Sequence, residues 1–99
     1  MGYDKNRFHP ISTTLLTIQQ QQCIWAMCKN FSTVFTREEK LRFHKLCMQV
    51  AGKYKDALFD YLVTSHSIKD VSDEFGVSVR TLQYYKTEFY NSFEYIHRI

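Results

Sequence analysis

Side chains that could contact a nucleic acid gather in one short segment near the end of this 99-residue sequence. Arg80 could pair with guanine or with a phosphate, or reach into a narrow minor groove, and Gln83 could bond to adenine or to a phosphate. Lys86 lies on the same helix, to one side of the face that carries Arg80 and Gln83, and we expect it to contact the phosphate backbone. The residues that we expect to contact DNA are Ser78, Val79, Arg80, Thr81, Gln83, Tyr84, Lys86 and Thr87.

The cysteines and histidines make a weaker case for metal binding or catalysis. Cys23 and Cys28, together with His44 and Cys47, supply four possible zinc ligands. Cys23 and Cys28 would point well away from each other on a helix, however, because they are five positions apart. The sequence also has no phosphate-binding loop and no signature of a nucleophile with its base. We therefore expect free thiols and no metal, cofactor, small-molecule ligand or enzymatic activity.

The elements that would hold the expected DNA contacts are two short helices joined at Gly76. Two helices that pack at a steep angle need a buried residue and then a small residue in the first helix. The first helix must end on an apolar residue, followed by a residue able to take positive φ. The turn must supply one apolar residue, and the second helix must supply two buried positions. The residues that meet these requirements in order are Val71, Ser72, Phe75, Gly76, Val77, Leu82 and Tyr85. This spacing predicts a helix-turn-helix whose second helix exposes Arg80.

Signals for helix starts and ends extend this interpretation over residues 36–99. Thr36 begins a T-x-x-E capping box, in which the threonine and the glutamate side chains each bind a backbone N–H group. Gly52 could end the helix that follows or could be a tolerated break within it. Ser67 and Ser78 are the expected caps of two later helices, the second of which is the last. No segment is typical of a strand, so we expect an all-α fold with four or five helices.

The first third of the chain carries less definite signals. Residues 1–11 are expected to form an irregular arm, and the first helix is expected to begin after Ser12 or Thr13. We therefore divide the chain into two parts. Residues 1–35 form an N-terminal arm and first helix that could serve oligomerisation, and residues 36–99 form the helix-turn-helix DNA-binding domain.

Aromatic residues are frequent, with seven Tyr, eight Phe and one Trp. So many rings exceed what the interior of a small monomer needs, which suggests a partner surface. Along the last helix we expect Tyr85 and Phe89 to face the protein's own core. Phe93 and Ile96, together with Trp25 of the first helix, are expected at a surface shared between protomers. The alternative is that the same aromatic stripe closes the domain's own core.

The net charge of +3 is mild and unevenly distributed. Residues 1–63 carry nine Lys or Arg against five Asp or Glu, whereas residues 64–99 carry four against five. With so few cations near the expected DNA contacts, one protomer should bind weakly and in a salt-sensitive way, so we expect a homodimer or a higher oligomer on DNA. The longest apolar run, Ile24 to Cys28, is far too short to span a membrane, and no signal peptide is evident. We expect a cytoplasmic protein.

Residues 53–89, and more loosely residues 36–99, resemble the PapB-type regulators of adhesin biosynthesis in enteric bacteria. The segment Ala57 to Val63 is similar to the family's Ala-Leu-x-Asp-Tyr-Leu-Val run before its helix-turn-helix. Asp70-Val71 and Val77-Ser78 fall at the matching offsets after that run. The chain departs from the family at the start of the second helix, where Arg80-Thr81-Leu82 stands in place of a frequent Gly-Tyr-Phe.

The resemblance implies a small bacterial, nucleoid-associated protein that regulates transcription of a fimbrial or adhesin operon. It further implies that oligomers bind AT-rich, repeated promoter sites on double-stranded DNA through the minor groove. The mild charge and the many aromatic residues support an alternative of a different class. In that alternative the chain is a protein–protein interaction module that forms a heterodimer with another DNA-bound regulator and modulates it.

Overall fold

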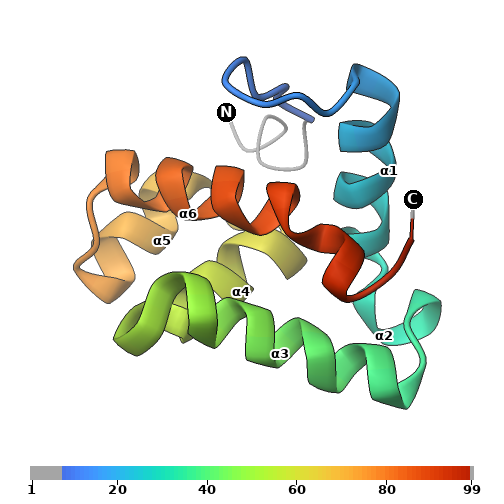
Figure 1. The fold of residues 1–99 in the computed structure, drawn as a ribbon. Helices are drawn as coiled ribbons and strands as arrows, with labels where there is room; N and C mark the ends of the chain where they lie inside the picture. Colours follow the sequence, from blue (N-terminus) through green and yellow to red (C-terminus); the bar gives the residue numbers. More distant parts are fainter. Residues whose placement is uncertain (1–7, 99) are drawn as a thin grey trace.

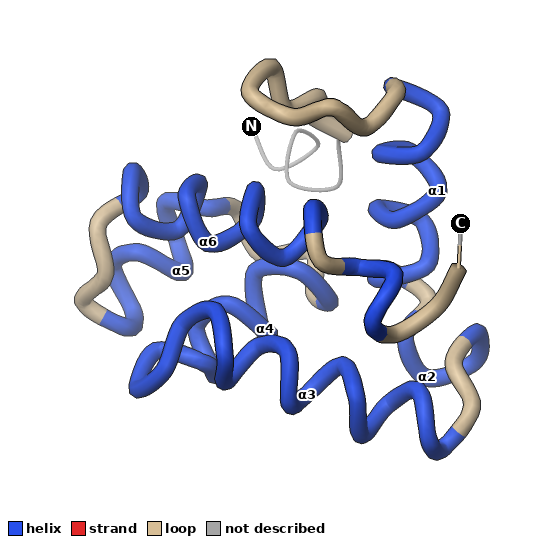
Figure 2. Tube along the Cα trace, viewed as in Figure 1, coloured by secondary structure: helices blue, strands red, loops and turns tan. Residues whose placement is uncertain are grey.

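Helices account for every regular element in residues 8–98, the part of the chain that the computed structural model describes (Figure 1). In chain order they are α1 (Ile18–Lys29), α2 (Phe31–Val34), α3 (Arg37–Ala51), the 3-10 turn η2 (Gly52–Tyr54), α4 (Lys55–Val63), α5 (Ile68–Phe75), α6 (Val79–Asn91) and the 3-10 turn η3 (Phe93–Tyr95). No strand occurs in this range, so the predicted all-α fold is confirmed (Figure 2). None of these helices is both long and apolar enough to cross a membrane.

Helix α1 begins later than the sequence predicted, because Thr17 rather than Ser12 or Thr13 is its N-cap. The Thr17 hydroxyl accepts a hydrogen bond from the Gln20 N–H group at 3.0 Å, and the Gln20 side chain accepts one from the Thr17 N–H group at 2.9 Å. This reciprocal capping box fixes the first turn of α1. Residues 8–17 therefore form an irregular segment before the helix, which we call the N-terminal arm.

Helices α3 and α4 follow the sequence signals closely. The Thr36 hydroxyl accepts a hydrogen bond from the Glu39 N–H group at 3.1 Å, and the Glu39 side chain accepts one from the Thr36 N–H group at 2.8 Å, so the predicted capping box is confirmed. Gly52 ends α3 with a φ of 55° and a ψ of −121°. Of the two interpretations of this glycine, the helix end is the correct one. The chain then turns through η2 into α4.

One large core joins α1, α3, α4, α6 and η3. Its largest buried rings are Phe43, Phe89, Tyr90 and Phe93, and the ring centroids of Phe43 and Phe89 lie 4.8 Å apart. Its other buried members are Ile24, Cys28, Phe35, Leu46, Cys47, Ala51, Leu58, Leu62 and Ile96. Residues near both ends of the described chain therefore pack against α3 and α4 in a single interior.

Phe93 and Ile96 are buried in this core, so their predicted place on an exposed oligomer surface is wrong. Helix α6 ends at Asn91, and η3 turns the chain back toward the core. As a result Phe93 is 1% exposed and Ile96 is 2% exposed. For these two residues the alternative interpretation, closure of the domain's own core, is correct.

A smaller core fastens α5 to α4 and α6. Its four buried members come from α4, α5, the turn after α5, and α6: Ala57, Val71, Val77 and Leu82. Tyr54 and Tyr85 pack against both cores and lie between them. Apolar burial on both sides of the turn thus sets the direction in which α6 leaves it.

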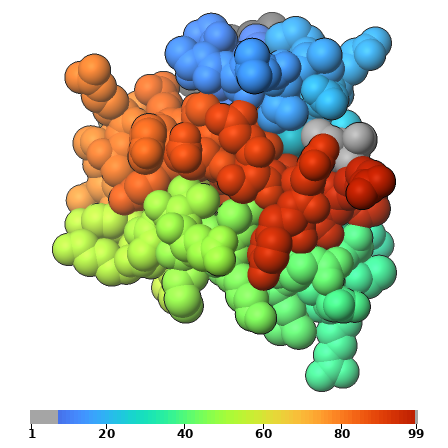
Figure 3. All heavy atoms as spheres, viewed as in Figure 1, coloured from blue at the N-terminus to red at the C-terminus, as the bar shows by residue number. Residues whose placement is uncertain are grey.

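The N-terminal arm packs over α6, as the blue spheres above the orange and red ones show in Figure 3. Gln21 of α1 is almost fully buried and holds the arm in place. Its side-chain oxygen accepts a hydrogen bond from the Ile11 N–H group at 2.7 Å, and its amide N–H groups donate to the carbonyl oxygens of Ile11 and Leu16, both at 3.2 Å. These three bonds satisfy a buried polar side chain and order the arm at the same time.

Candidate nucleic-acid interface

A turn of three residues, Gly76 to Ser78, joins α5 to α6. Gly76 has a φ of 67° and a ψ of 33°, a left-handed conformation that suits glycine best. The N–H groups of Gly76 and Val77 both point to the carbonyl oxygen of Ser72, at 3.0 and 3.3 Å. Val77 is 4% exposed and lies in the smaller core. Gly76 and Val77 therefore have the positive φ and the burial that the sequence predicted.

Ser78 caps the start of α6. Its hydroxyl oxygen accepts a hydrogen bond from the Thr81 N–H group at 3.1 Å, and its O–H group donates to the Thr81 hydroxyl at 2.8 Å. The first N–H groups of any helix lack partners within that helix, and the helix dipole places positive potential beside them. The start of α6 can therefore receive a phosphate oxygen.

The outer face of α6 presents four of the predicted contact residues to solvent, namely Ser78, Arg80, Gln83 and Tyr84. Tyr84 has 60% of its area exposed. Val79 and Thr81 beside them are half-buried. Arg80 makes no hydrogen bond or ion pair with any residue in the range 8–98, so its guanidinium can reach a ligand. The structure brings these six residues to one end of α6.

Lys86 does not belong to this exposed face, because the N-terminal arm covers it. The side chain is 9% exposed, and its Nζ donates a hydrogen bond to the His9 carbonyl oxygen at 3.1 Å. Nζ also lies 6.0 Å from the ring centroid of Tyr61 and 5.5 Å from that of Tyr90. The predicted contact of Lys86 with the phosphate backbone is therefore wrong for this conformation.

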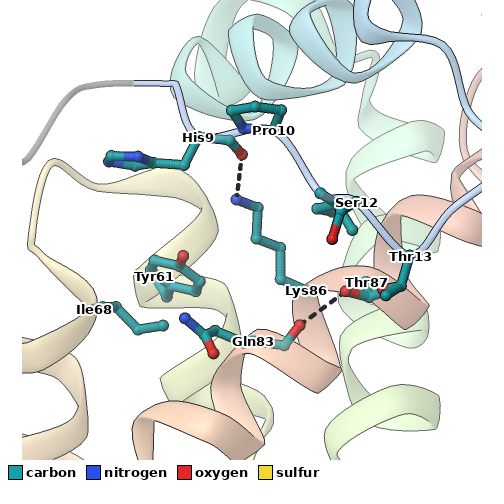
Figure 4. Close-up of a pocket in the computed structure, with 10 residues that line it drawn as sticks. His9, Pro10, Ser12, Thr13, Tyr61, Ile68, Gln83, Lys86 and Thr87 are labelled. Carbon is teal, nitrogen blue, oxygen red and sulfur yellow. Dashed lines mark hydrogen bonds between the residues drawn. The ribbon is translucent and has the colours of Figure 1, made fainter.

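A groove of about 490 Å³ lies between the N-terminal arm and helices α4, α5 and α6 (Figure 4). Its lining comes from residues 9–13 of the arm, Tyr61, Ile68 and three residues of α6: Gln83, Lys86 and Thr87. Thr87 is half-buried, and its hydroxyl donates to the Gln83 carbonyl oxygen at 3.0 Å. Gln83 and Thr87 thus lie on the border between the exposed face and the groove. No local sequence pattern marks where the arm docks, so this groove could not be predicted from the sequence.

Exposed acidic side chains outnumber exposed cations on α5 and α6. Helix α5 exposes one cation, Lys69, beside three acids, Asp70, Asp73 and Glu74, and α6 exposes Glu88. Burial lowers the pKa of Lys86, and repulsion from the nearby Lys29 lowers it further. With Lys86 covered, Arg80 is the exposed cation of α6. The surface around it is therefore far from strongly basic.

The predicted interface residues do not form a common surface. Trp25 is half-buried, and its ring meets the Phe8 ring edge-on with 6.3 Å between centroids. Phe93 and Ile96 lie inside the large core. The side chain of Trp25 therefore packs against the N-terminal arm within the same chain.

The thiols and histidines of the described range do not gather into a metal site. In residues 8–98 no group of three or more His, Cys, Asp or Glu is arranged to hold a metal ion. Cys28 and Cys47 are buried free cysteines, and desolvation raises the pKa of both thiols, that of Cys47 to about 12. Such neutral thiols pack as small apolar groups.

Comparison of the chain with family models, curated proteins and solved structures finds no match. The resemblance to PapB-type regulators therefore stands on the residues quoted for it and remains an expectation.

Proposed function

We propose that this chain binds double-stranded DNA with α6 as its recognition helix and thereby regulates transcription. The observation that carries the proposal is the corner between α5 and α6. Buried Val71, Val77 and Leu82 fasten this corner, and α6 directs Arg80 and Gln83 to solvent. An arginine and a glutamine about one turn apart can bond to base edges or phosphates in a groove, while the helix start binds a phosphate.

The proposed target follows from the resemblance: AT-rich, repeated promoter sites of a bacterial fimbrial or adhesin operon, bound at the nucleoid. The charge of the site supports binding by several protomers. Each phosphate neutralised on duplex DNA contributes about −0.9 to the slope of log K against log salt. A protomer whose contact helix exposes one cation, Arg80, has a shallow slope and low affinity. When linked protomers bind side by side, the first binding event raises the effective concentration for the second, so the assembly binds far more tightly than one protomer.

A second function has support of its own. The ring of Tyr84 is 60% exposed, and helix α5, which packs against α6, exposes three acidic residues. A surface that combines an exposed aromatic ring with carboxylates suits a protein partner with a basic surface. In this case the chain would form a heterodimer with another DNA-bound regulator and modulate it.

A fluorescence anisotropy titration on an AT-rich repeat duplex at low salt tests the first function. The variant Arg80→Ala/Gln83→Ala removes both expected base contacts, each worth about 1–3 kcal/mol. Together the two contacts amount to about 2–6 kcal/mol, so this variant should bind at least about thirtyfold more weakly than the unaltered chain. The matched control Arg37→Ala/Gln19→Ala removes the same two residue types from exposed positions on α3 and α1 and should bind normally.

Equal binding by the two double variants would refute the assignment of α6 as recognition helix. If the unaltered chain shows no affinity for any duplex at low salt, DNA binding itself is refuted. Co-elution with a purified DNA-bound regulator would then favour the second function.

A further inference from the structure

The groove beside the N-terminal arm contains a buried cation with few partners. Lys86 crosses the groove from α6 to the arm, as Figure 4 shows. Its ammonium group has three N–H donors, and the His9 carbonyl oxygen, at 3.1 Å, is its hydrogen-bond acceptor within residues 8–98. The rings of Tyr61 and Tyr90 offer only their faces. The ammonium can therefore bind further acceptors.

No carboxylate in the described range pairs with Lys86. The charged side chain that acts on it most is Lys29, which carries the same sign. The Lys29 ammonium donates to the carbonyl oxygens of Tyr61 and Thr64 at the end of α4. Asp60, the acid whose charge acts on Lys29, is hydrogen-bonded to the His66 ring. A buried cation is costly unless an anion accompanies it, and no side chain between residues 8 and 98 supplies one to Lys86.

The groove has the size and lining of a site for a small molecule. Its volume of about 490 Å³ falls within the range of small-ligand pockets. Polar side chains of the arm and of α6 line it, namely Ser12, Thr13, Gln83 and Thr87. Ile11 of the arm and Ile68 of α5 add apolar surface, and Tyr61 of α4 adds an aromatic ring that carries a hydroxyl group.

We propose that this groove binds a small organic oxyanion, a carboxylate or a phosphate ester, whose oxygens pair with the Lys86 ammonium. Ser12 and Thr13 donate further hydrogen bonds to the oxyanion, and its apolar part rests on Tyr61 and Ile68. Because Gln83 borders the groove, an occupant also changes the face of α6 that meets DNA. The effect on DNA binding rests on the proposed function, whereas anion binding does not.

Amide NMR of the full chain tests the site without DNA. Sodium benzoate and sodium phosphate are titrated separately, with chloride holding the ionic strength constant. We expect saturable shifts for at least one of these anions, confined to the groove: residues 9–13 and 83–87 and, for benzoate, also Tyr61 and Ile68. Lys86→Met should weaken this binding at least tenfold, and Lys86→Arg should retain it. Lys45→Met, which removes an exposed lysine of α3, should leave it unchanged.

A second variant is needed because Lys86→Met also removes the hydrogen bond between Lys86 and the arm, which could displace the arm. Ser12→Ala/Thr13→Val leaves the Gln21 bonds to the arm in place and should weaken anion binding several-fold. Shifts that never saturate, or that persist unchanged in Lys86→Met, would overturn the proposal. If a short duplex shifts these resonances but neither free anion does, the groove binds a phosphate of the DNA backbone. That result would overturn the proposal of a free small-molecule ligand. Loss of DNA binding alone would leave the anion result untouched.

Discussion

Gly76 stabilises the corner between α5 and α6 through its left-handed backbone conformation, so replacing it should lower the free energy of unfolding. A Cβ atom added at Gly76 would meet no atom within 4 Å, so Gly76→Ala creates no clash. The whole cost comes from the φ of 67°, which an L residue adopts at about 1–2 kcal/mol. In a domain of this size, a loss of about 1 kcal/mol in the free energy of unfolding lowers Tm by about 4–8 °C. Gly76→Ala should therefore lower Tm by about 4–16 °C.

A Gly76→Asn variant separates the effect of the backbone conformation from a general sensitivity of this position to mutation. Asn tolerates the left-handed region, so Gly76→Asn should recover much of the loss. Gly52, with a φ of 55° and a ψ of −121°, lies outside every region that L residues favour, so Gly52→Asn should not be better tolerated than Gly52→Ala. Thermal and urea unfolding of the four variants measure these differences. A Gly76→Ala variant as stable as the unaltered protein, or a Gly76→Asn variant equally destabilised, would refute the reasoning.

Gln21→Ala should free the N-terminal arm, because it removes three hydrogen bonds; amide exchange should then quicken in the arm, and an unchanged rate there would contradict this. Asp60→Asn should lower the pKa of His66, which its hydrogen bond to the Asp60 carboxylate raises above 6.5, as an NMR titration would measure. In the unaltered protein this pair stabilises the fold fully below pH 6.5, and the contribution disappears as pH rises through the raised pKa. A thiol reagent should label exposed Cys23 in the native protein and buried Cys28 only after unfolding; early labelling of Cys28 would contradict its burial.

Local signals explain why the corner could be predicted from the sequence. The cap of α5 by Ser67, the positive φ of Gly76 and the cap of α6 by Ser78 each depend on residues within three positions. Apolar spacing then predicted that Val71 and Leu82 are buried, and both have 0% exposure. The candidate DNA face follows from the same periodicity, because Arg80 lies opposite the buried side of α6.

Long-range contacts explain what the sequence did not predict. Lys86 is covered because it meets His9, 77 positions earlier, and no pattern around either residue indicates that contact. Phe93 and Ile96 continue the apolar period of α6, yet the Ser92 N–H group closes the helix on Glu88 and Phe89. With no glycine or proline to mark this end, the periodicity alone suggested a longer helix.

The large core has a consequence for synthesis on the ribosome. Ile24 and Cys28 are made well before Phe93 and Ile96, which complete their surroundings. Until residue 96 has left the exit tunnel, the apolar sides of α1, α3 and α4 lack a cover. Before that point the nascent chain exposes apolar surface of the kind that chaperones bind.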